Sequence, residues 1–406
     1  MQNLYESPPL PVRVKPSPDI LVICRTFLPE VGGIQEYAYN RCLQDPERII
    51  VLAAACPGDA EFDLAQPFTI YRWFNPPLLQ KMGVLGSLLK QVLAMVCSCA
   101  IALQLYRRYH YRAIEWSHAY DFPALLLLSY LLPIRSLFIY LHGNDLLCAL
   151  KQPVVRSLFV WTLGRLQGVI CNSAFTQEYL QTHLSVPRPI YIIHPSVRPE
   201  KFALTNPLEQ NNERDSVRQH HNIPETAIVI LSVGRLIRRK GFQRLIAQLP
   251  DLLTLDLDVH LILCGRGPMA TELRELADRL QVSDRVHFPG RVEDAVLARY
   301  YAAADLFAML TFFDAEASCI EGFGIVYLEA GYFGKPVIAV RVGGVSDAVL
   351  HEENGLLVDP DSPQDITAVL SRLCRDPALR ERLGRRGQEL AVRITPHRCI
   401  YESENS

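Results

Sequence analysis

Two glutamates, Glu321 and Glu329, frame the stretch that carries the most chemical information, EGFGIVYLEA. A helix that begins near Gly324 would leave the backbone N–H groups of Gly324 and Ile325 available to an anion. Eight residues of helix rise about 12 Å, so the two carboxylates cannot serve as acid and base on one bond. They would instead contact different parts of one extended ligand, such as a sugar and a ribose. An ordinary helix with Glu329 facing solvent is the alternative.

Cations cluster in a second stretch, GRLIRRKG, in which four of the six residues 235–240 are Lys or Arg. Arg235 could hold a diphosphate with its planar fork, and Lys240 could hold it as a point charge. A solvated basic loop is the other interpretation. The GxxxxGK[ST] pattern of a Walker loop is absent from the sequence.

Glycine pairs mark two more loops that a phosphate could approach closely. Gly32 and Gly33 lie in PEVGGIQ, where a helix N-terminus would offer N–H groups to an anion. Gly265 and Gly267 lie in CGRGP, in a turn that suits base binding or helix packing. A flexible turn remains the alternative for the first pair, which is not a GxGxxG fingerprint.

One histidine, His142, directly follows the apolar segment Ser136–Leu141. If that segment is a strand of a parallel sheet, the imidazole lies at the edge where ligands bind. A structural histidine with its hydrogen bonds satisfied is the alternative.

The segments around these residues alternate between short apolar runs and longer helical stretches, a pattern typical of parallel sheets with crossover helices. The expected strands of a first series are Ile20–Cys24, Ile49–Ala53, Thr69–Arg72, Ala113–Trp116, Ser136–Leu141, Gly168–Cys171 and Ile190–Ile193. Those of a second series are Ala227–Val233, Val259–Cys264, Arg285–Phe288, Asp305–Met309, Pro336–Val340 and Leu356–Val358. The polar run Thr205–Asp215 is interpreted as a surface segment or linker. The sequence therefore predicts an α/β protein with two doubly wound, Rossmann-like domains.

The predicted divisions are a Pro-rich leader over 1–18, one domain over 19–198, a second over 199–388 and a short tail over 389–406. A length of 406 residues suits two domains. Forty-one Lys and Arg against 43 Asp and Glu give a formal net charge of −2, and 21% of the residues are charged. This composition argues against disorder and against nucleic acid as a partner. The leader lacks the apolar stretch of a secretory signal.

Eleven cysteines form no CxxC pair, which favours reduced thiols and a cytoplasmic location. Two apolar stretches, Val84–Tyr106 and Phe122–Ile134, come nearest to membrane spans. The first is interrupted by polar residues and the second has only about half of the ~20 residues a span needs, so buried helices are favoured. Basic residues next to the first stretch would nevertheless suit peripheral contact with anionic lipids; they are Arg107, Arg108, His110 and Arg112.

Taken together, these motifs resemble family 4 of the retaining nucleotide-sugar glycosyltransferases, over nearly the whole chain from about Ile20 to Val392. The most specific match is the pair of glutamates in EGFGIVYLEA, which have seven residues between them. The other matching motifs are GRLIRRKG, PEVGGIQ, LHGND, CNSAF, CGRGP and GKPVIAVRVGGVSD. Asp314 and Glu316, which precede the glutamate pair, add a weaker similarity to the phosphatidylinositol mannosyltransferase-like subgroup.

The resemblance implies the GT-B arrangement of two facing Rossmann-like domains and a role for each motif. Arg235 and Lys240 would hold the donor diphosphate, and Gly33 would contact phosphate from the opposite domain. Glu321 would hold the transferred sugar and the distal phosphate, with the backbone of Gly322, Phe323, Gly324 and Ile325. Glu329 would accept hydrogen bonds from the ribose hydroxyls, and His142 would line the donor sugar.

The resemblance also implies an activity: a retaining hexosyltransferase, with mannose or glucose favoured. It would use a UDP- or GDP-sugar as donor and a lipid-linked or polysaccharide acceptor, with no cofactor and no metal site. Two alternatives are a sugar-nucleotide epimerase on a similar scaffold and an inactive nucleotide-sugar-binding module.

Three segments depart from the family pattern. The hinge has His194-Pro195-Ser196-Val197-Arg198 where Asn-Gly-Val-Asp is common, so altered domain closure is expected. The tail is short and polar, where relatives return a longer helix to the first domain. The loop Thr311–Ile320 lengthens the approach to Glu321 and could shape specificity for the sugar or the acceptor.

Overall fold

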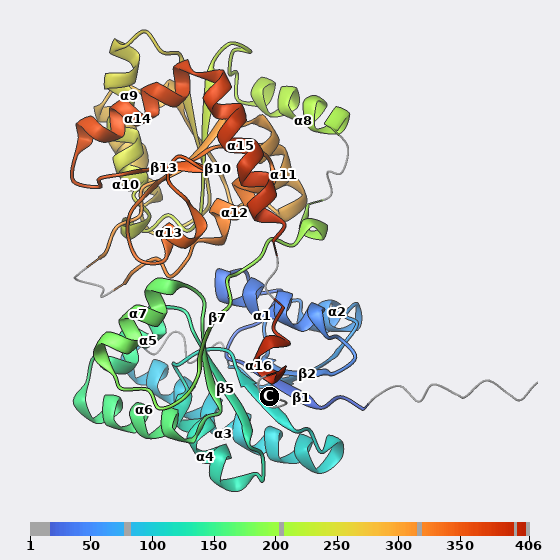
Figure 1. Cartoon of the computed structure of the whole chain (residues 1–406). Helices are drawn as coiled ribbons and strands as arrows, with labels where there is room; N and C mark the ends of the chain where they lie inside the picture. The colour runs from blue at the N-terminus through green and yellow to red at the C-terminus, as the bar shows by residue number, and fades with distance from the viewer. Residues whose placement is uncertain (1–16, 77–82, 203–206, 315–318, 394–395, 403–406) are drawn as a thin grey trace, which may run out of the picture.

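A computed structural model describes residues 17–76, 83–202, 207–314, 319–393 and 396–402. It contains two parallel sheets of seven and six strands, one above the other in Figure 1. The first has the order β3-β2-β1-β4-β5-β6-β7 and the second β10-β9-β8-β11-β12-β13. The strands of the first sheet are β1 (Ile20–Cys24), β2 (Ile49–Ala54), β3 (Thr69–Trp73), β4 (Ala113–Trp116), β5 (Ser136–Leu141), β6 (Gly168–Cys171) and β7 (Ile190–Ile192). Those of the second are β8 (Ile228–Val233), β9 (Val259–Cys264), β10 (Val286–Gly290), β11 (Leu306–Met309), β12 (Val337–Val340) and β13 (Gly355–Val358).

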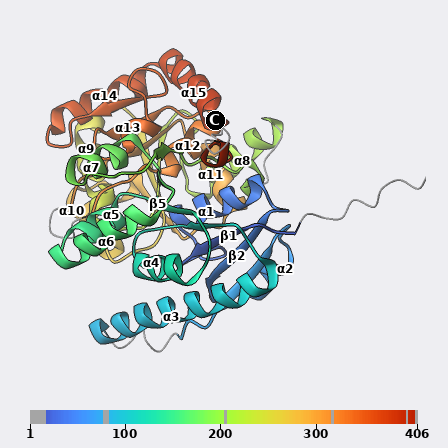
Figure 2. The same cartoon turned by 60° about the horizontal axis from the view of Figure 1, so that its bottom comes forward.

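Helices cover both faces of each sheet (Figures 1 and 2). Those of the first domain are α1 (Gly33–Gln44), α2 (Asp59–Leu64), α3 (Gly83–Tyr109), α4 (Phe122–Leu131), α5 (Asn144–Leu150), α6 (Pro153–Arg165) and α7 (Ala174–His183). Those that follow are α8 (Pro207–His220), α9 (Phe242–Thr254), α10 (Ala270–Arg279), α11 (Asp294–Ala303), α12 (Ile325–Tyr332), α13 (Val345–Ala348), α14 (Pro363–Arg375), α15 (Pro377–Ala391) and α16 (Cys399–Glu402).

All thirteen predicted strands are present, and their ends differ by at most two residues from those expected. The prediction succeeds because strands buried on both faces are nearly continuous apolar runs. In β1 and β9 every residue is buried. The two-domain α/β architecture is therefore confirmed.

The run Thr205–Asp215, interpreted from the sequence as a surface segment or linker, is helical from Pro207 onward, where α8 begins. Residues 203–206 lie outside the described residues, as does the leader up to residue 16. The segment is rich in Glu, Gln and Arg, which are good helix formers even without an apolar stripe. Low hydrophobicity in this run therefore did not exclude a helix.

The C-terminal segment returns to the first domain, although its shortness had left the tie between the domains in doubt. The predicted boundary at residue 388 falls inside α15, and α16 lies beside the first sheet (Figure 1). There the Tyr401 hydroxyl donates to Glu115 Oε1 at 2.6 Å, and Arg398 Nε donates to Asp45 Oδ1 at 2.8 Å. The side chain of Ile400 is fully buried. The C-terminal segment is therefore packed against the first domain by these contacts.

The acceptor of that tyrosine, Glu115, lies at the centre of a buried polar network. Arg41 Nη2 donates to Glu115 Oε1 at 2.7 Å, and the Tyr140 hydroxyl donates to Oε2 at 2.5 Å. Burial alone would raise the pKa of Glu115, but the Arg41 charge and these hydrogen bonds lower it to about 2. The tail thus binds a carboxylate that stays ionised at neutral pH.

The expectation that the two apolar stretches form buried helices holds for only one face of each. Ala102 and Leu105 of α3 are buried, but only 28% of the apolar stretch Leu88–Tyr109 lies inside the protein. This stretch is long and apolar enough to cross a membrane, and the pair α5–α6, bent by 115°, passes the same test together. Side chains of α3 that are exposed are Leu88, Leu89, Val92 and Val96. Hydropathy alone could not separate a buried helix from one that packs on a single side.

Candidate functional site

The cationic loop after β8 faces Glu321 across the carboxyl edge of the second sheet. Lys240 Nζ donates to Glu321 Oε2 at 2.6 Å, and Arg239 Nη1 donates to the same oxygen at 2.9 Å. Glu321 Oε1 makes no hydrogen bond to any described residue. Arg235 is exposed, and its guanidinium has no ion-pair partner in the described part of the chain. The structure thus brings Lys240 and Glu321 together, leaving one carboxylate oxygen and one guanidinium for a ligand.

The charges in this cluster stay ionised because they are paired. Burial by itself raises the pKa of Glu321, but Lys240 and Arg239 lower it to about 2. Burial lowers the pKa of Lys240, against the opposing effect of Glu321. With Arg235, the cluster contains three cationic side chains and one carboxylate, that of Glu321. The site therefore has surplus positive charge, which suits an anionic ligand.

A glycine turn brings Lys240 into this position. Gly241 has a φ of +73°, and a Cβ there would lie 1.9 Å from the carbonyl oxygen of Leu310. Glycine therefore closes the 3₁₀ turn Arg238–Lys240 against the end of β11. Gly265 has a similar packing role, since a Cβ there would lie 1.8 Å from the Gly234 carbonyl oxygen. This supports helix or loop packing as the reason for Gly265.

Two helix N-termini face each other between the domains. As predicted, α12 begins directly after Gly324 and α1 begins at Gly33 after Gly32. A Cβ on Gly33 would lie 3.9 Å from Ile325 Cδ1, so the two helix starts are neighbours. The N-terminal turns of both helices therefore lie close together between the domains, where their free N–H groups would favour a phosphate.

His142 also reaches the domain interface, through its backbone. A Cβ on Gly322 would lie 1.9 Å from the His142 carbonyl oxygen, so these loops are in direct contact. The imidazole points into its own domain, where Nε2 donates to the Ser117 carbonyl at 2.7 Å. Burial lowers the pKa of His142, so its ring is neutral and Nδ1 is an acceptor. Both the structural and the functional interpretation of this residue remain compatible with the geometry.

Glu329 lies in a separate buried cluster. Its Oε1 accepts from Lys201 Nζ at 2.8 Å, and its Oε2 accepts from the Tyr301 hydroxyl at 2.9 Å. Burial by itself lowers the pKa of Lys201. The negative charges of Glu329 and Glu36 outweigh this effect, so the pKa lies above its usual value. Glu321 and Glu329 therefore lie in separate clusters with different side-chain partners, and their predicted contacts with two parts of one ligand stay a prediction. The alternative of a solvent-facing Glu329 is wrong, because only 5% of this residue is exposed.

Four residues of the site were not singled out from the sequence. Arg239 and Lys201 are described above; Asn144 and Asp347 join the domains. Asn144 Oδ1 accepts from the Ile320 N–H at 2.7 Å, and Asp347 Oδ2 lies 3.0 Å from His194 Nε2. The motifs LHGND and GKPVIAVRVGGVSD contain the last two, whereas nothing in the sequence marks Lys201.

The other predicted residues and segments lie as follows. The Phe323 side chain is buried, with its ring centroid 5.4 Å from that of His194 in the hinge. Asp314 pairs with Cys319 in a short antiparallel bridge, whereas Glu316 lies outside the described residues.

All eleven cysteines are free thiols. In the described residues there is no group of three or more His, Cys, Asp or Glu side chains arranged to hold a metal.

Two family profiles match this chain, one for each domain. The profile described as Glycosyltransferase Family 4 matches residues 31–201, and that described as Glycosyl transferases group 1 matches residues 213–390. The chain is 26% identical over 377 residues to a GDP-mannose-dependent alpha-(1-6)-phosphatidylinositol monomannoside mannosyltransferase of Mycolicibacterium smegmatis, covering 92% of this chain and 94% of the relative. It is 36% identical over 214 residues to a D-inositol 3-phosphate glycosyltransferase of Corynebacterium glutamicum, covering 51% of this chain and 49% of that one.

Solved structures share the fold over nearly the whole chain. The Anabaena protein HepE in complex with UDP-glucose has a TM-score of 0.74 at 22% identity, covering 95% of this chain and 99% of its own. A sucrose-phosphate synthase from Thermosynechococcus elongatus has a TM-score of 0.73 at 21% identity, covering 95% and 97%. The two facing domains are therefore a shared architecture.

Proposed function

Because the chain belongs to glycosyltransferase family 4 and has the GT-B fold, we propose that it is a retaining hexosyltransferase. The donor is a UDP- or GDP-sugar, with mannose or glucose favoured. The acceptor is lipid-linked or a polysaccharide, and no cofactor or metal takes part. Support for mannose comes from the mycobacterial mannosyltransferase, and support for a UDP-glucose donor comes from the HepE complex.

The observation that carries this proposal is the surplus positive charge beside two helix N-termini. Arg239 and Lys240 pair with the single carboxylate of Glu321, and the exposed Arg235 is close enough for its charge to affect Lys240. A donor diphosphate bound there would neutralise the excess cations and accept hydrogen bonds from the first turn of α12. These groups replace the charge that a metal would supply.

In the proposed reaction an acceptor hydroxyl attacks the anomeric carbon on the face from which the diphosphate leaves. A new carbon–oxygen bond forms as the bond to the diphosphate oxygen breaks, and the acceptor proton passes to that oxygen. Arg235 and Lys240 stabilise the developing negative charge. Glu321 Oε1 is available to accept from a sugar hydroxyl, and the neutral Nδ1 of His142 could accept another. Glu329 would bind the ribose from its separate cluster.

The first test is calorimetric titration with UDP, GDP and ADP in the presence of a chelator. We expect one nucleotide to bind selectively without metal. Incubation with the matching sugar nucleotides, with and without acceptor, then separates transfer from epimerisation, since an epimerase changes the donor alone. Absence of binding to all three nucleotides would contradict the proposal, and so would binding that requires a divalent metal.

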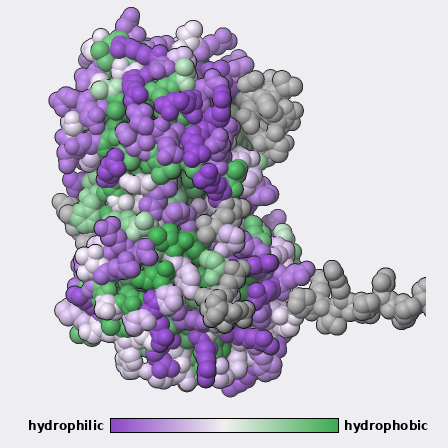
Figure 3. Space-filling model, viewed as in Figure 1, coloured by the Kyte–Doolittle hydropathy of each residue, from purple (hydrophilic) through white to green (hydrophobic). Residues whose placement is uncertain are grey.

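We also propose that the enzyme acts in the cytoplasm, docked on the inner face of the membrane through its first domain. Exposed apolar side chains lie on neighbouring helices of that domain: Leu88, Leu89, Val92 and Val96 on α3, Leu127, Tyr130 and Leu131 on α4, and Val154, Val160 and Trp161 on α6. Figure 2 shows α3 as an outer layer, and Figure 3 shows apolar surface on the lower domain. Basic residues that end α3 would attract anionic lipids.

Flotation with anionic and with neutral vesicles tests this docking. We expect the protein to float with anionic vesicles at low salt and less so at high salt, because the attraction of Arg107 and Arg108 is screened. Val92→Ser with Val96→Ser should reduce flotation at both salt concentrations. Failure to float with either vesicle at either salt would overturn the proposal.

A further inference from the structure

Lys201, in the segment between β7 and α8 that connects the two domains, is the centre of a buried ion cluster. Its ammonium lies 2.8 Å from Glu329 Oε1, 3.5 Å from Asp294 Oδ1 and 3.9 Å from Glu36 Oε1. Glu329 and Asp294 belong to the second domain, on α12 and α11, whereas Glu36 lies in the first turn of α1 in the first domain. Only 9% of the Lys201 side chain is exposed. One lysine therefore pairs with carboxylates of both domains.

Two donors orient the carboxylate of Glu329. Lys201 Nζ donates to Oε1, and the Tyr301 hydroxyl donates to Oε2 at 2.9 Å. An ionised carboxylate has about four acceptor positions, so about one further position remains on each oxygen. Two neighbouring hydroxyl groups, such as those of a ribose, match this pair of positions. Glu329 also lies four residues after Ile325, on the same face of α12 as the helix start that would bind phosphate.

The first domain holds the connecting segment through α1. Glu36 Oε1 lies 3.4 Å from Arg198 Nη2, in the hinge sequence that departs from the family pattern. The guanidinium carbon of Arg198 also lies 5.0 Å from the centroid of the Tyr39 ring. Asn40 Nδ2 donates to the Ser196 carbonyl at 2.8 Å. The helix whose N-terminus lies beside that of α12 is therefore also bound to the segment that carries Lys201.

The charges of this cluster depend on one another. Burial raises the pKa of Glu36, whereas the charges of Lys201 and Arg198 oppose that effect. Glu36, Asp294 and Glu329 supply three carboxylates against these two cations. Removal of Lys201 would leave the buried carboxylates of Glu36 and Glu329 without the cation that they share, and such a loss is unfavourable.

We propose that Lys201 is a positioning residue, which orients Glu329 toward the ribose of the donor nucleotide and, through Glu36, couples ribose binding to closure of the two domains. This inference rests on the proposed transferase function and assigns a role in it to a residue outside the nucleotide-binding motifs. Lys201 acts through Glu329 and not on the reacting atoms. An acceptor that Lys201 and Tyr301 have already fixed loses less conformational freedom when it binds a diol than a mobile one does.

The test compares UDP and GDP with their 2′-deoxy forms by calorimetry. We expect the wild-type protein to prefer the ribonucleotide form of the nucleotide that it binds. Lys201→Met should reduce this preference by about 10-fold, because Glu329 loses the donor that fixes Oε1. Lys201→Arg should keep most of the preference, since a guanidinium can still donate to that oxygen.

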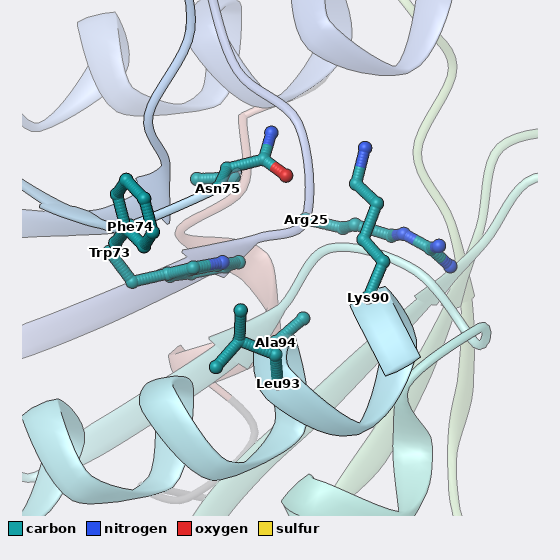
Figure 4. A pocket seen from close by; sticks show the side chains of 8 residues that line it. Arg25, Trp73, Phe74, Asn75, Lys90, Leu93 and Ala94 are labelled. Carbon is teal, nitrogen blue, oxygen red and sulfur yellow. The ribbon is translucent and has the colours of Figure 1, made fainter. Parts of the chain in front are cut away.

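Lys90→Met is the matched control, because it removes a lysine that has no ion pair with any residue that the structure describes. Figure 4 shows Lys90 on α3, beside a narrow pocket of the first domain. This variant should bind both forms as the wild-type protein does. A purely structural role for Lys201 would make Lys201→Met bind the ribonucleotide and the 2′-deoxy form more weakly by the same factor. That result would overturn the proposal, and so would a Lys201→Met protein that keeps the full preference.

Glu36→Gln tests the link to the first domain with a side chain of nearly the same size. We expect kcat for sugar transfer to fall by about 10-fold, because closure of the domains is weakened. The ribonucleotide preference should be retained, since Lys201 still contacts Glu329. Thermal unfolding shows whether each variant keeps its fold, and Glu36→Gln still tests the coupling if Lys201→Met does not fold. An unchanged kcat in Glu36→Gln would contradict the coupling to domain closure.

The wild-type measurements keep this inference apart from the proposed function. If the wild-type protein binds a nucleotide and transfers sugar, while Lys201→Met and Glu36→Gln behave as it does, only the role of Lys201 is contradicted. If the wild-type protein binds neither UDP nor GDP, the proposed transferase function is contradicted, and the role of Lys201 is contradicted with it.

Discussion

Replacing Lys240 by alanine is expected to lower kcat/KM for sugar transfer by on the order of 100-fold or more. Its ammonium lies 2.6 Å from Glu321 Oε2 and belongs to the charge that would stabilise the departing diphosphate. Arg235→Ala should have an effect of similar size, because its exposed guanidinium has no ion-pair partner among the described residues. Steady-state rates at varied donor concentration measure both losses.

A control variant on the same domain separates this effect from a general loss of charge. Arg385 on α15 is 69% exposed and pairs only with Glu381 among the described residues, so Arg385→Ala should transfer sugar at the wild-type rate. Thermal unfolding of each variant shows whether the fold is retained. If Lys240→Ala and Arg235→Ala both keep near-wild-type turnover, the assignment of the diphosphate to this loop is wrong.

Gly322→Ala is expected to reduce transfer by about 100-fold while nucleotide binding is largely retained. The new Cβ would lie 1.9 Å from the His142 carbonyl oxygen in the opposite domain, a distance that atoms cannot adopt. The two domains must then move apart at this contact, and a displacement of about 1 Å at a reacting centre can cost 100-fold. The cationic loop and α12 belong to one domain, so the nucleotide would still find its partners.

Small-angle scattering and nucleotide calorimetry on the same protein measure the two halves of this prediction. Gly322→Ala should have a larger radius of gyration than the wild-type protein. Gly164→Ala is the matched control, because a Cβ there meets nothing within 4 Å. Wild-type transfer by Gly322→Ala would show that the contact between Gly322 and His142 is not needed for the reaction.

The positions of most candidate residues followed from local patterns. Lys240 lies in the loop that follows the buried strand β8 and directly precedes a glycine, and Glu321 lies four residues before the start of α12. Because the carboxyl ends of parallel strands meet at one edge of a sheet, the sequence predicts that such residues gather there. The observed pairing of Lys240 with Glu321 agrees with this reasoning.

Local patterns could not identify residues whose importance comes from a distant partner. Arg239 and Arg238 are indistinguishable in the run RRK, and the 3₁₀ turn decides that Arg239 reaches Glu321. Lys201 stands in no motif, yet it contacts Glu329, which is 128 residues away. The short tail likewise gave no sign that Tyr401 reaches Glu115, because that contact depends on where α15 ends in space.

By itself, the sequence determined the two-domain α/β fold, the order of strands and helices along the chain and the loops that carry charge. These properties arise from the continuous apolar runs of buried strands, from helix-start signals and from the steric freedom of glycine, all of which act over a few residues. The tertiary structure alone decided which cation pairs with which carboxylate, which face of α3 is exposed and how the tail joins the first domain. Those depend on contacts between residues far apart in the chain, which form only when the elements pack.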